Sequence, residues 1–235
     1  MKRIDVVYFV KDTPDNDELI YSVRSVVENF PYRKIWFVGG CPKGIRPDGH
    51  IRFIQNRGSK YANVRGMIEL VSNCQDITED FWLFNDDFFV MSKVAEPKTI
   101  VRESLWRTYQ RLQDKYKSPT GYAKKLKRTA VILKDINKDR LNYDAHVPMM
   151  INRDKAKTVL KIFDGTVAFR SVYGNYYQIG GVVHPDVKII DTDERPDPDI
   201  HNVYLSTSDQ SFYFGKAGEV IRKTFTEPSK YEVAE

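Results

Sequence analysis

The stretch Phe81-Trp-Leu-Phe-Asn-Asp-Asp-Phe-Phe-Val90 is apolar and aromatic throughout, except at Asn85, Asp86 and Asp87. This composition predicts a buried strand that ends at two carboxylates. Burying an unpaired charge is unfavourable, so the aspartates need a partner. They could cap a turn or pair with lysine and arginine side chains. The aromatic residues on both sides favour a binding site instead. Because α/β proteins bind ligands at the carboxyl ends of their strands, a strand end with two carboxylates suits a divalent cation that carries a phosphorylated ligand.

Strand and helix patterns alternate around this stretch. Thr13 or Asp15 can cap a helix that follows the first strand, and Glu18 completes a capping box with Asp15. The alternation predicts an α/β fold in a single domain, 1–235, with a Rossmann-like mixed sheet flanked by helices. The predicted strands are 2–10, 33–38, 51–54 and 81–90.

A second helix is predicted to begin after Ser59, which is a suitable capping residue. Its apolar residues recur three and four positions apart, which places Lys60, Asn63 and Arg65 near its amino end. A helix amino end with free N–H groups and basic side chains can bind phosphate. Ordinary capping with solvated charges explains the same pattern.

Positive charge is concentrated in one segment. The chain has a net charge of +5, yet residues 102–140 alone hold twelve lysines and arginines against four acidic residues. We predict a basic helical insertion at about 95–140. Such a patch suits an anionic partner, whether nucleic acid, a phosphorylated polymer or a membrane surface, and a solvated helical face is the alternative. Its most basic residues are Lys124, Lys125, Lys127 and Arg128.

The composition argues against several other classes. No run approaches the roughly 18 apolar residues of a transmembrane helix, and the first residues lack the apolar region of a signal peptide. A cytoplasmic protein without a transmembrane segment is therefore expected. Cys41 and Cys74 form no zinc-binding pattern and provide no disulfide framework, so we expect them to be packing residues.

Short blocks occur in a recognisable order along nearly the whole chain. The first four are Ile4-Asp-Val-Val-Tyr8, Asp15-Asn-Asp-Glu-Leu-Ile-Tyr-Ser-Val-Arg-Ser25, Phe30-Pro-Tyr-Arg-Lys-Ile-Trp36 and Phe84-Asn-Asp-Asp-Phe-Phe89. They resemble the first two conserved regions of the Stealth family, sugar-1-phosphate transferases that include bacterial capsule polymerases and the lysosomal N-acetylglucosamine-1-phosphotransferase. The blocks similar to its third and last regions are Asp144-Ala-His-Val-Pro148 with Phe169-Arg170, and Ser208-Asp209 with Glu227-Pro-Ser-Lys-Tyr-Glu232.

This chain departs from the family pattern in three respects. Phe9-Val-Lys-Asp12 stands where the family has a Trp-Val-Asp-Gly-type turn, Ser208-Asp209 stands where it has Asn-Asp, and the chain is short for the family. A shortened member could keep the donor fold and use a different acceptor.

The resemblance implies a GT-A-like sheet and a transferase. The enzyme would move a sugar or sugar-1-phosphate from a nucleotide sugar, in particular a UDP-sugar, to a hydroxyl of an anionic polymer. Mg²⁺ or Mn²⁺ held by Asp87 and Asp86 would neutralise charge on the diphosphate. The basic insertion supports an alternative acceptor, DNA, as in the base glycosyltransferases that phages encode. A non-catalytic module that binds nucleotide sugar or nucleic acid is a third alternative.

The resemblance also implies roles for single side chains. His146 would be the general base for the acceptor hydroxyl, the alternative being a histidine satisfied in the core. Arg170 would bind phosphate oxygens or pair with the acidic loop expected at 186–199. Asp209 would bind the ion, orient the base or cap a helix. The expected donor-binding residues are Asp12, Arg24, Lys60, Asn63 and Arg65, and the expected acceptor-binding residues are Lys124, Lys125, Lys127 and Arg128.

Overall fold

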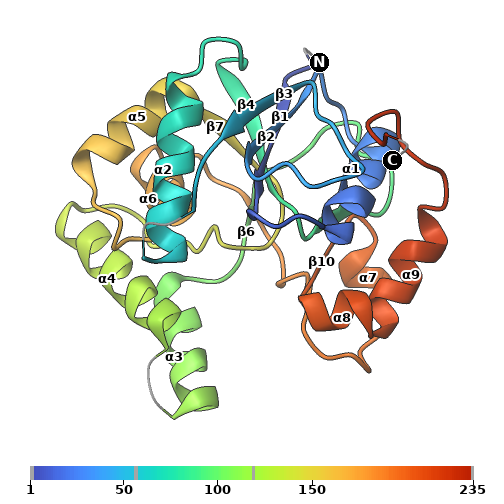
Figure 1. Cartoon of the computed structure of the whole chain (residues 1–235). Coiled ribbons are helices and arrows are strands. Elements are labelled where there is room, and N and C mark those ends of the chain that lie inside the picture. The colour runs from blue at the N-terminus through green and yellow to red at the C-terminus, as the bar shows by residue number, and fades with distance from the viewer. Residues whose placement is uncertain (1–2, 56–57, 118–119, 234–235) are drawn as a thin grey trace.

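A five-stranded mixed sheet forms the centre of the structure, a computed structural model that describes residues 3–55, 58–117 and 120–233 (Figure 1). The strands lie in the order β3-β2-β1-β4-β7. The first four are parallel, and β7 runs antiparallel to β4. Their bounds are Asp5–Val10 for β1, Ile35–Gly39 for β2, Gly49–Arg52 for β3, Asp80–Asn85 for β4 and Met149–Asn152 for β7.

Helices cover both faces of this sheet, which explains why its central strand is apolar on both sides. All six residues of β1 are buried. Val7 and Phe9 pack in a core with α2, α5 and α6, whereas the alternate residues of β1 pack with α1. The prediction of a mixed sheet flanked by helices is confirmed, and the arrangement is compatible with a Rossmann-like fold. The bounds of these helices are Asp17–Asn29 for α1, Lys60–Asn73 for α2, Arg153–Ile162 for α5 and Phe169–Tyr176 for α6.

Polar side chains cap α1 and α2, but the first cap is not the predicted one. The side chain of Asn16 accepts a hydrogen bond from the backbone N–H of Leu19 and caps α1, so the prediction of Thr13 or Asp15 was wrong. Ser59 caps α2 as predicted. Because Asn16 takes the capping position, Glu18 is not part of a capping box, and its side chain is buried.

The apolar stretch 81–90 forms two strands rather than one. β4 ends at Asn85, the chain turns at Asp86 and Asp87, and β5 (Phe88–Val90) follows. β5 belongs to a second sheet, ordered β5-β10-β9, whose other strands are Tyr204–Thr207 (β10) and Lys188–Ile189 (β9). The acid pair therefore lies where the chain passes from one sheet to the other.

The acidic segment 186–199 is not wholly an exposed loop, contrary to the prediction. It contains β9 and the start of α7 (Pro198–His201). Just before it, β8 (Val182–Val183) pairs in parallel with β6 (Ile100–Val101). This small sheet anchors the start of the acidic segment to the start of the basic insertion.

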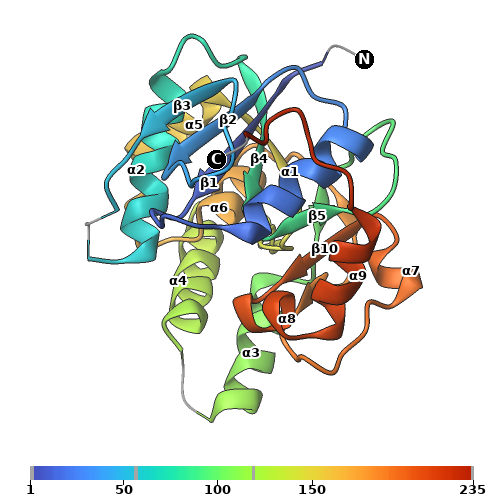
Figure 2. The ribbon, with the colours of Figure 1, turned by 45° about the vertical axis from the view of Figure 1, so that its right-hand side comes forward.

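The basic insertion contains two helices, α3 (Leu105–Tyr116) and α4 (Gly121–Asp135). They extend below the central sheet, on the side away from the N-terminus (Figures 1 and 2). The last two helices, α8 (Asp209–Tyr213) and α9 (Lys216–Thr224), pack against β5 and β10. Within the described residues, no helix is both long and apolar enough to cross a membrane.

The strand order defines where a ligand would bind. The chain leaves β1 for β2 on one side and later returns through α2 to β4 on the other side of β1. A crevice forms where neighbouring parallel strands have connections in opposite directions, outside their carboxyl ends. In this sheet the two strands are β1 and β4, and Phe9 pairs with Asn85 at that end.

Candidate functional site

The acid pair begins directly after Asn85, at this crevice. Asp86 Oδ2 accepts a hydrogen bond of 2.8 Å from Asn16 Nδ2. Burial, and after it the charge of Asp87, raises the pKa of Asp86 to about 6. A cation close to Asp86 would therefore favour the ionised form that burial disfavours.

Asp87 has an incomplete set of partners. Its Oδ2 accepts hydrogen bonds from Lys188 Nζ at 2.6 Å and from Ser206 Oγ at 3.2 Å. Its Oδ1 is buried and has no hydrogen-bond partner among the described residues. Leaving a buried acceptor unpaired is unfavourable. The lysine contact that the sequence allows as an alternative is thus present at one oxygen, and the other is left for a ligand or ion.

Glu18, for which the sequence predicts only a capping role, adds a third carboxylate. Its side chain, 8% exposed, accepts a hydrogen bond of 2.9 Å from Thr207 Oγ1. Burial first, and then the charges of Asp87, Asp86 and Asp209, raise the pKa of Glu18 to about 8 against the effect of the Thr207 hydroxyl. The acidic run that opens α1 is the only sequence signal of this cluster, and a capping role accounts for it equally well.

A pocket of about 600 Å³ extends from this crevice to the α3–α4 pair. Phe9 and Asn85 line it at the sheet, and Leu112 and Tyr122 line it at the helices. The volume is typical of cofactor and small-molecule sites. Lys188, the partner of Asp87, also lines the pocket. The pocket brings together five predicted site residues from separate parts of the chain, namely Lys60, Arg65, Lys125, His146 and Arg170.

His146 is held by two residues that the motifs do not reveal. Its Nδ1 lies 2.8 Å from Asp186 Oδ1, and Asp186 Oδ2 lies 2.9 Å from a guanidinium nitrogen of Arg102. Burial acts to raise the pKa of Asp186, but His146 and Arg102 together lower it below the usual value. The ionised carboxylate therefore orients the ring so that Nδ1 donates and Nε2 can accept a proton. His146 also has a φ of +50°, an unfavourable conformation that is typical of functional sites.

The β6–β8 pair explains how these residues meet. Arg102 directly follows β6, and Asp186 follows β8 after a short connection. Because the two strands are parallel neighbours, and His184 N–H bonds to Val101 O at 2.9 Å, both side chains emerge at the same end. Asp186 lies in the segment predicted to be an exposed loop, yet its side chain is only 24% exposed.

Arg170 lies in the pocket wall near the end of β4. Its guanidinium donates to the carbonyls of Val147 at 2.6 Å and Leu83 at 3.4 Å, and it lies 5.3 Å from the centre of the Phe88 ring. Burial lowers the pKa of Arg170, opposed by the charges of two nearby aspartates. In the described part of the chain it forms no ion pair, so the alternative of a bridge to 186–199 is not seen there.

The other predicted donor-binding and acceptor-binding cations differ in whether their charged groups already have partners. Both terminal nitrogens of Arg65 donate to backbone carbonyls, one to Phe163 at 2.7 Å and one to Leu160. Lys125 Nζ lies 3.6 Å from the centre of the Tyr61 ring, and burial lowers its pKa to about 8. The remaining predicted acceptor residues do not line the pocket and lie on the exposed side of α4: Lys124, Lys127 and Arg128.

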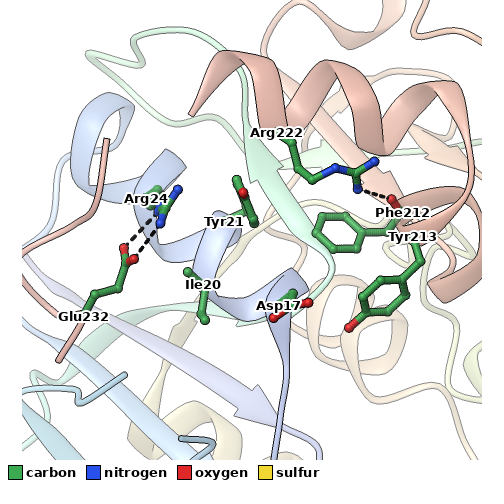
Figure 3. A pocket seen from close by; sticks show the side chains of 8 residues that line it. All are labelled: Asp17, Ile20, Tyr21, Arg24, Phe212, Tyr213, Arg222 and Glu232. Carbon is green, nitrogen blue, oxygen red and sulfur yellow. Dashed lines mark hydrogen bonds and ion pairs between the residues drawn. The ribbon is translucent and has the colours of Figure 1, made fainter. Parts of the chain in front are cut away.

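Arg24 lies away from His146, in a second pocket of about 510 Å³ between α1 and the α8–α9 pair (Figure 3). Its guanidinium forms two hydrogen bonds with the carboxylate of Glu232, at 2.6 and 2.9 Å, and another with Phe225 O at 2.9 Å. These contacts tie α1 to the C-terminal segment. The geometry thus gives Arg24 a structural role rather than a place beside the acid pair.

Five further predicted residues do not line the pocket, and two of them are Asp86 and Asp87, which lie just behind Asn85 and Lys188. The other three lie elsewhere. Asp12 is paired with Arg52 through hydrogen bonds of 2.7 and 3.0 Å. Asp209 is exposed in the first turn of α8, which Ser208 caps, although its charge acts on Glu18. Asn63 lies in the first turn of α2.

The acid pair suits an ion that is shared with a ligand. Among the described residues, no group of three histidine, cysteine or acidic side chains could hold a metal by itself. Mg²⁺ needs only one or two carboxylates and completes its coordination with water and substrate phosphates. The unpartnered Oδ1 of Asp87, next to Asp86, is the observation that fits such an ion.

Comparison with models of known protein families and with curated proteins finds no match. The similarity to the Stealth family is therefore carried only by the sequence blocks quoted above.

Proposed function

We propose that the chain is a transferase that moves a sugar or a sugar-1-phosphate from a nucleotide sugar to a hydroxyl of a polymer. One observation carries the proposal: an acid pair with an unpartnered buried oxygen follows Asn85 and contacts Lys188, two residues that line the pocket in which His146 is bonded to Asp186. The first feature suits a cation with a diphosphate, and the second suits removal of a proton from a hydroxyl. A site that only binds a nucleotide sugar would not need the second feature.

The diphosphate of the donor would lie at the carboxyl ends of β1 and β4. Arg170 and Lys188 line the pocket at this end. Arg170 donates hydrogen bonds only to carbonyls among the described residues, so a phosphate would provide the anion for a charge-assisted hydrogen bond. A UDP-sugar on a GT-A-type sheet is the donor arrangement that we propose.

Asp86 and Asp87 would hold Mg²⁺ or Mn²⁺. When bound, the ion would offset negative charge that develops on the diphosphate during transfer. The crowding of carboxylates supports this assignment, because burial and mutual repulsion raise the pKa of Asp86 to about 6 and that of Glu18 to about 8. A divalent cation would relieve this repulsion.

His146 would act as the general base. Its Nε2 would take the proton of the acceptor hydroxyl while that oxygen bonds either to the anomeric carbon or to the phosphorus that carries the sugar. The bond to the rest of the nucleotide breaks, and a nucleoside diphosphate or monophosphate leaves with the bonding electrons. Asp186 would stay ionised, held by Arg102, and stabilise the imidazolium that forms.

Phosphorus NMR of the protein with a panel of nucleotide sugars and Mg²⁺ or Mn²⁺ tests the proposal. Release of nucleoside monophosphate indicates sugar-phosphate transfer, and release of nucleoside diphosphate indicates glycosyl transfer. Saturable donor binding without release of either product in the presence of candidate acceptors would favour the non-catalytic module. Turnover that survives both Asp87→Ala and His146→Ala would refute the assignment of the site.

A further inference from the structure

We infer that the outer half of the pocket, between α2 and the α3–α4 pair, is an acceptor subsite for a nucleobase of a nucleic acid strand. The inference rests on the proposed transferase and names the class of its acceptor. Three observations carry it: tyrosine rings at the pocket, amines placed over those rings, and a basic outer face on the same helices.

Tyrosines line the pocket on the side of α2 and the α3–α4 pair. Tyr61 comes from α2, Tyr116 from the end of α3 and Tyr122 from the start of α4. Tyr116 is 48% exposed, and Tyr61 and Tyr122 are partly buried. Tyrosine rings provide flat surfaces on which any nucleobase can stack. An acceptor with a planar aromatic group fits this lining better than a wholly polar chain.

Each of these rings except Tyr122 has a lysine over it. The Nζ atoms of Lys125 and Lys60 lie 3.6 and 5.3 Å from the centre of Tyr61, and that of Lys115 lies 5.4 Å from the centre of Tyr116. None of the three lysines is in an ion pair within the described residues. Amines alternating with aromatic rings can bind phosphates and bases of one strand together.

Lys125 is a partly buried amine whose charged form a bound anion would stabilise. Burial lowers the pKa of Lys125 to about 8, although the charge of Asp144 opposes this. The amine is thus held in a pocket that disfavours its charge, where it donates to the carbonyl of Gly165 at 3.4 Å and lies 3.6 Å from the centre of the Tyr61 ring. A phosphate of a bound strand would compensate for that cost.

The outer face of α4 would extend the contact. Lys124 and Lys127 are exposed there, one on each side of Lys125 in sequence. A flat membrane surface would engage this exposed face but would not reach tyrosines inside a pocket of about 600 Å³. The pocket therefore fits a nucleic acid strand that inserts a base better than it fits a lipid surface. Because unmodified bases carry no alcohol group, the acceptor hydroxyl would be that of a hydroxymethylated base, held in the pocket that Asp144 and His146 also line.

Fluorescence anisotropy with single-stranded DNA tests the inference. The probes are a short oligothymidylate, an abasic oligonucleotide of the same length and charge, and anionic phospholipid vesicles as competitor. Intact DNA is expected to bind on the order of tenfold more tightly than abasic DNA, because stacking of a base contributes that much. Equal affinity for the two oligonucleotides, or binding to vesicles alone, would overturn the inference.

Matched variants locate the site. Tyr61→Leu keeps an apolar side chain and should remove most of the preference for intact DNA. Lys127→Gln, on the outer face, should weaken binding of both oligonucleotides about equally and reduce its salt dependence. If Tyr61→Leu leaves the preference intact while the thermal melting of the variant is normal, the base does not bind here.

The outcome separates this inference from the proposed function. Base-dependent DNA binding that is lost in Tyr61→Leu supports the subsite whether or not a donor is turned over. Release of nucleotide from a donor by a protein without base-dependent DNA binding overturns the subsite and leaves the transferase in place.

Discussion

Replacing Glu18 by glutamine should change how the stability of the fold depends on pH. Burial, the main cause, and the nearby aspartates raise the pKa of Glu18 from 4.5 to about 8. The unfolded chain therefore releases this proton at a lower pH than the folded protein does. The contribution of Glu18 to stability is fully present below the unfolded pKa and is lost as pH rises through the folded pKa.

The expected loss follows from the size of the shift. One pKa unit corresponds to about 1.4 kcal/mol, so the wild-type free energy of unfolding should fall by roughly 2 kcal/mol between about pH 6.5 and about pH 8. Asp86 adds little in this window, because its raised pKa is only about 6. Glu18→Gln keeps an oxygen that can accept the Thr207 hydrogen bond and should abolish most of this decrease.

Urea unfolding at a series of pH values measures the effect. The matched control is Glu28→Gln on the exposed side of the same helix, which should leave the wild-type pH dependence unchanged. An identical decrease in wild type and Glu18→Gln would refute the account of a crowded carboxylate cluster beside Asp86 and Asp87.

Three further predictions concern Asp87, Asp186 and Arg24. Mg²⁺ should raise the melting temperature of the wild type above about pH 8, where Glu18 ionises, and Asp87→Asn should remove that shift; an equal shift in both proteins would place the ion elsewhere. Asp186→Asn should lower kcat on the order of 100-fold with little change in donor KM, because His146 loses the carboxylate that orients it, and an unchanged kcat would contradict this. Arg24→Gln should reduce the free energy of unfolding by about 2 kcal/mol, since Arg24 is largely buried against Glu232, without weakening donor binding; weaker donor binding in the folded variant would return Arg24 to the donor site.

Local patterns in the sequence predict much of the fold. The apolar stretch before Asn85 forms a buried strand of the central sheet, and Ser59 caps the helix that its position predicts. Both depend on residues close together in the chain. The cap of α1 was predicted wrongly because several polar residues in a row can cap a helix. Asn16 also donates to Asp86, 70 residues away, and no local pattern encodes that contact.

The remaining parts of the site depend on contacts that no local pattern encodes. His146 and Asp186 are 40 residues apart and meet through β6 and β8, strands of two residues each that are too short to show periodicity. Glu18 bonds to Thr207 across 189 residues. The basic residues of α4 likewise divide between pocket and solvent only once the packed side of the helix is known, which is why Lys125 separates from Lys124 and Lys127.

The most direct test of the transferase is to measure, by phosphorus NMR in the presence of Mg²⁺, the release of nucleotide from a nucleotide-sugar donor. The wild type and the Glu28→Gln control should release the same nucleotide product at the same rate, whereas His146→Gln and Asp87→Asn should each slow the release on the order of 100-fold. Release at the wild-type rate by both site variants, or no release from any donor by the wild type in the presence of acceptors, would contradict the proposed function.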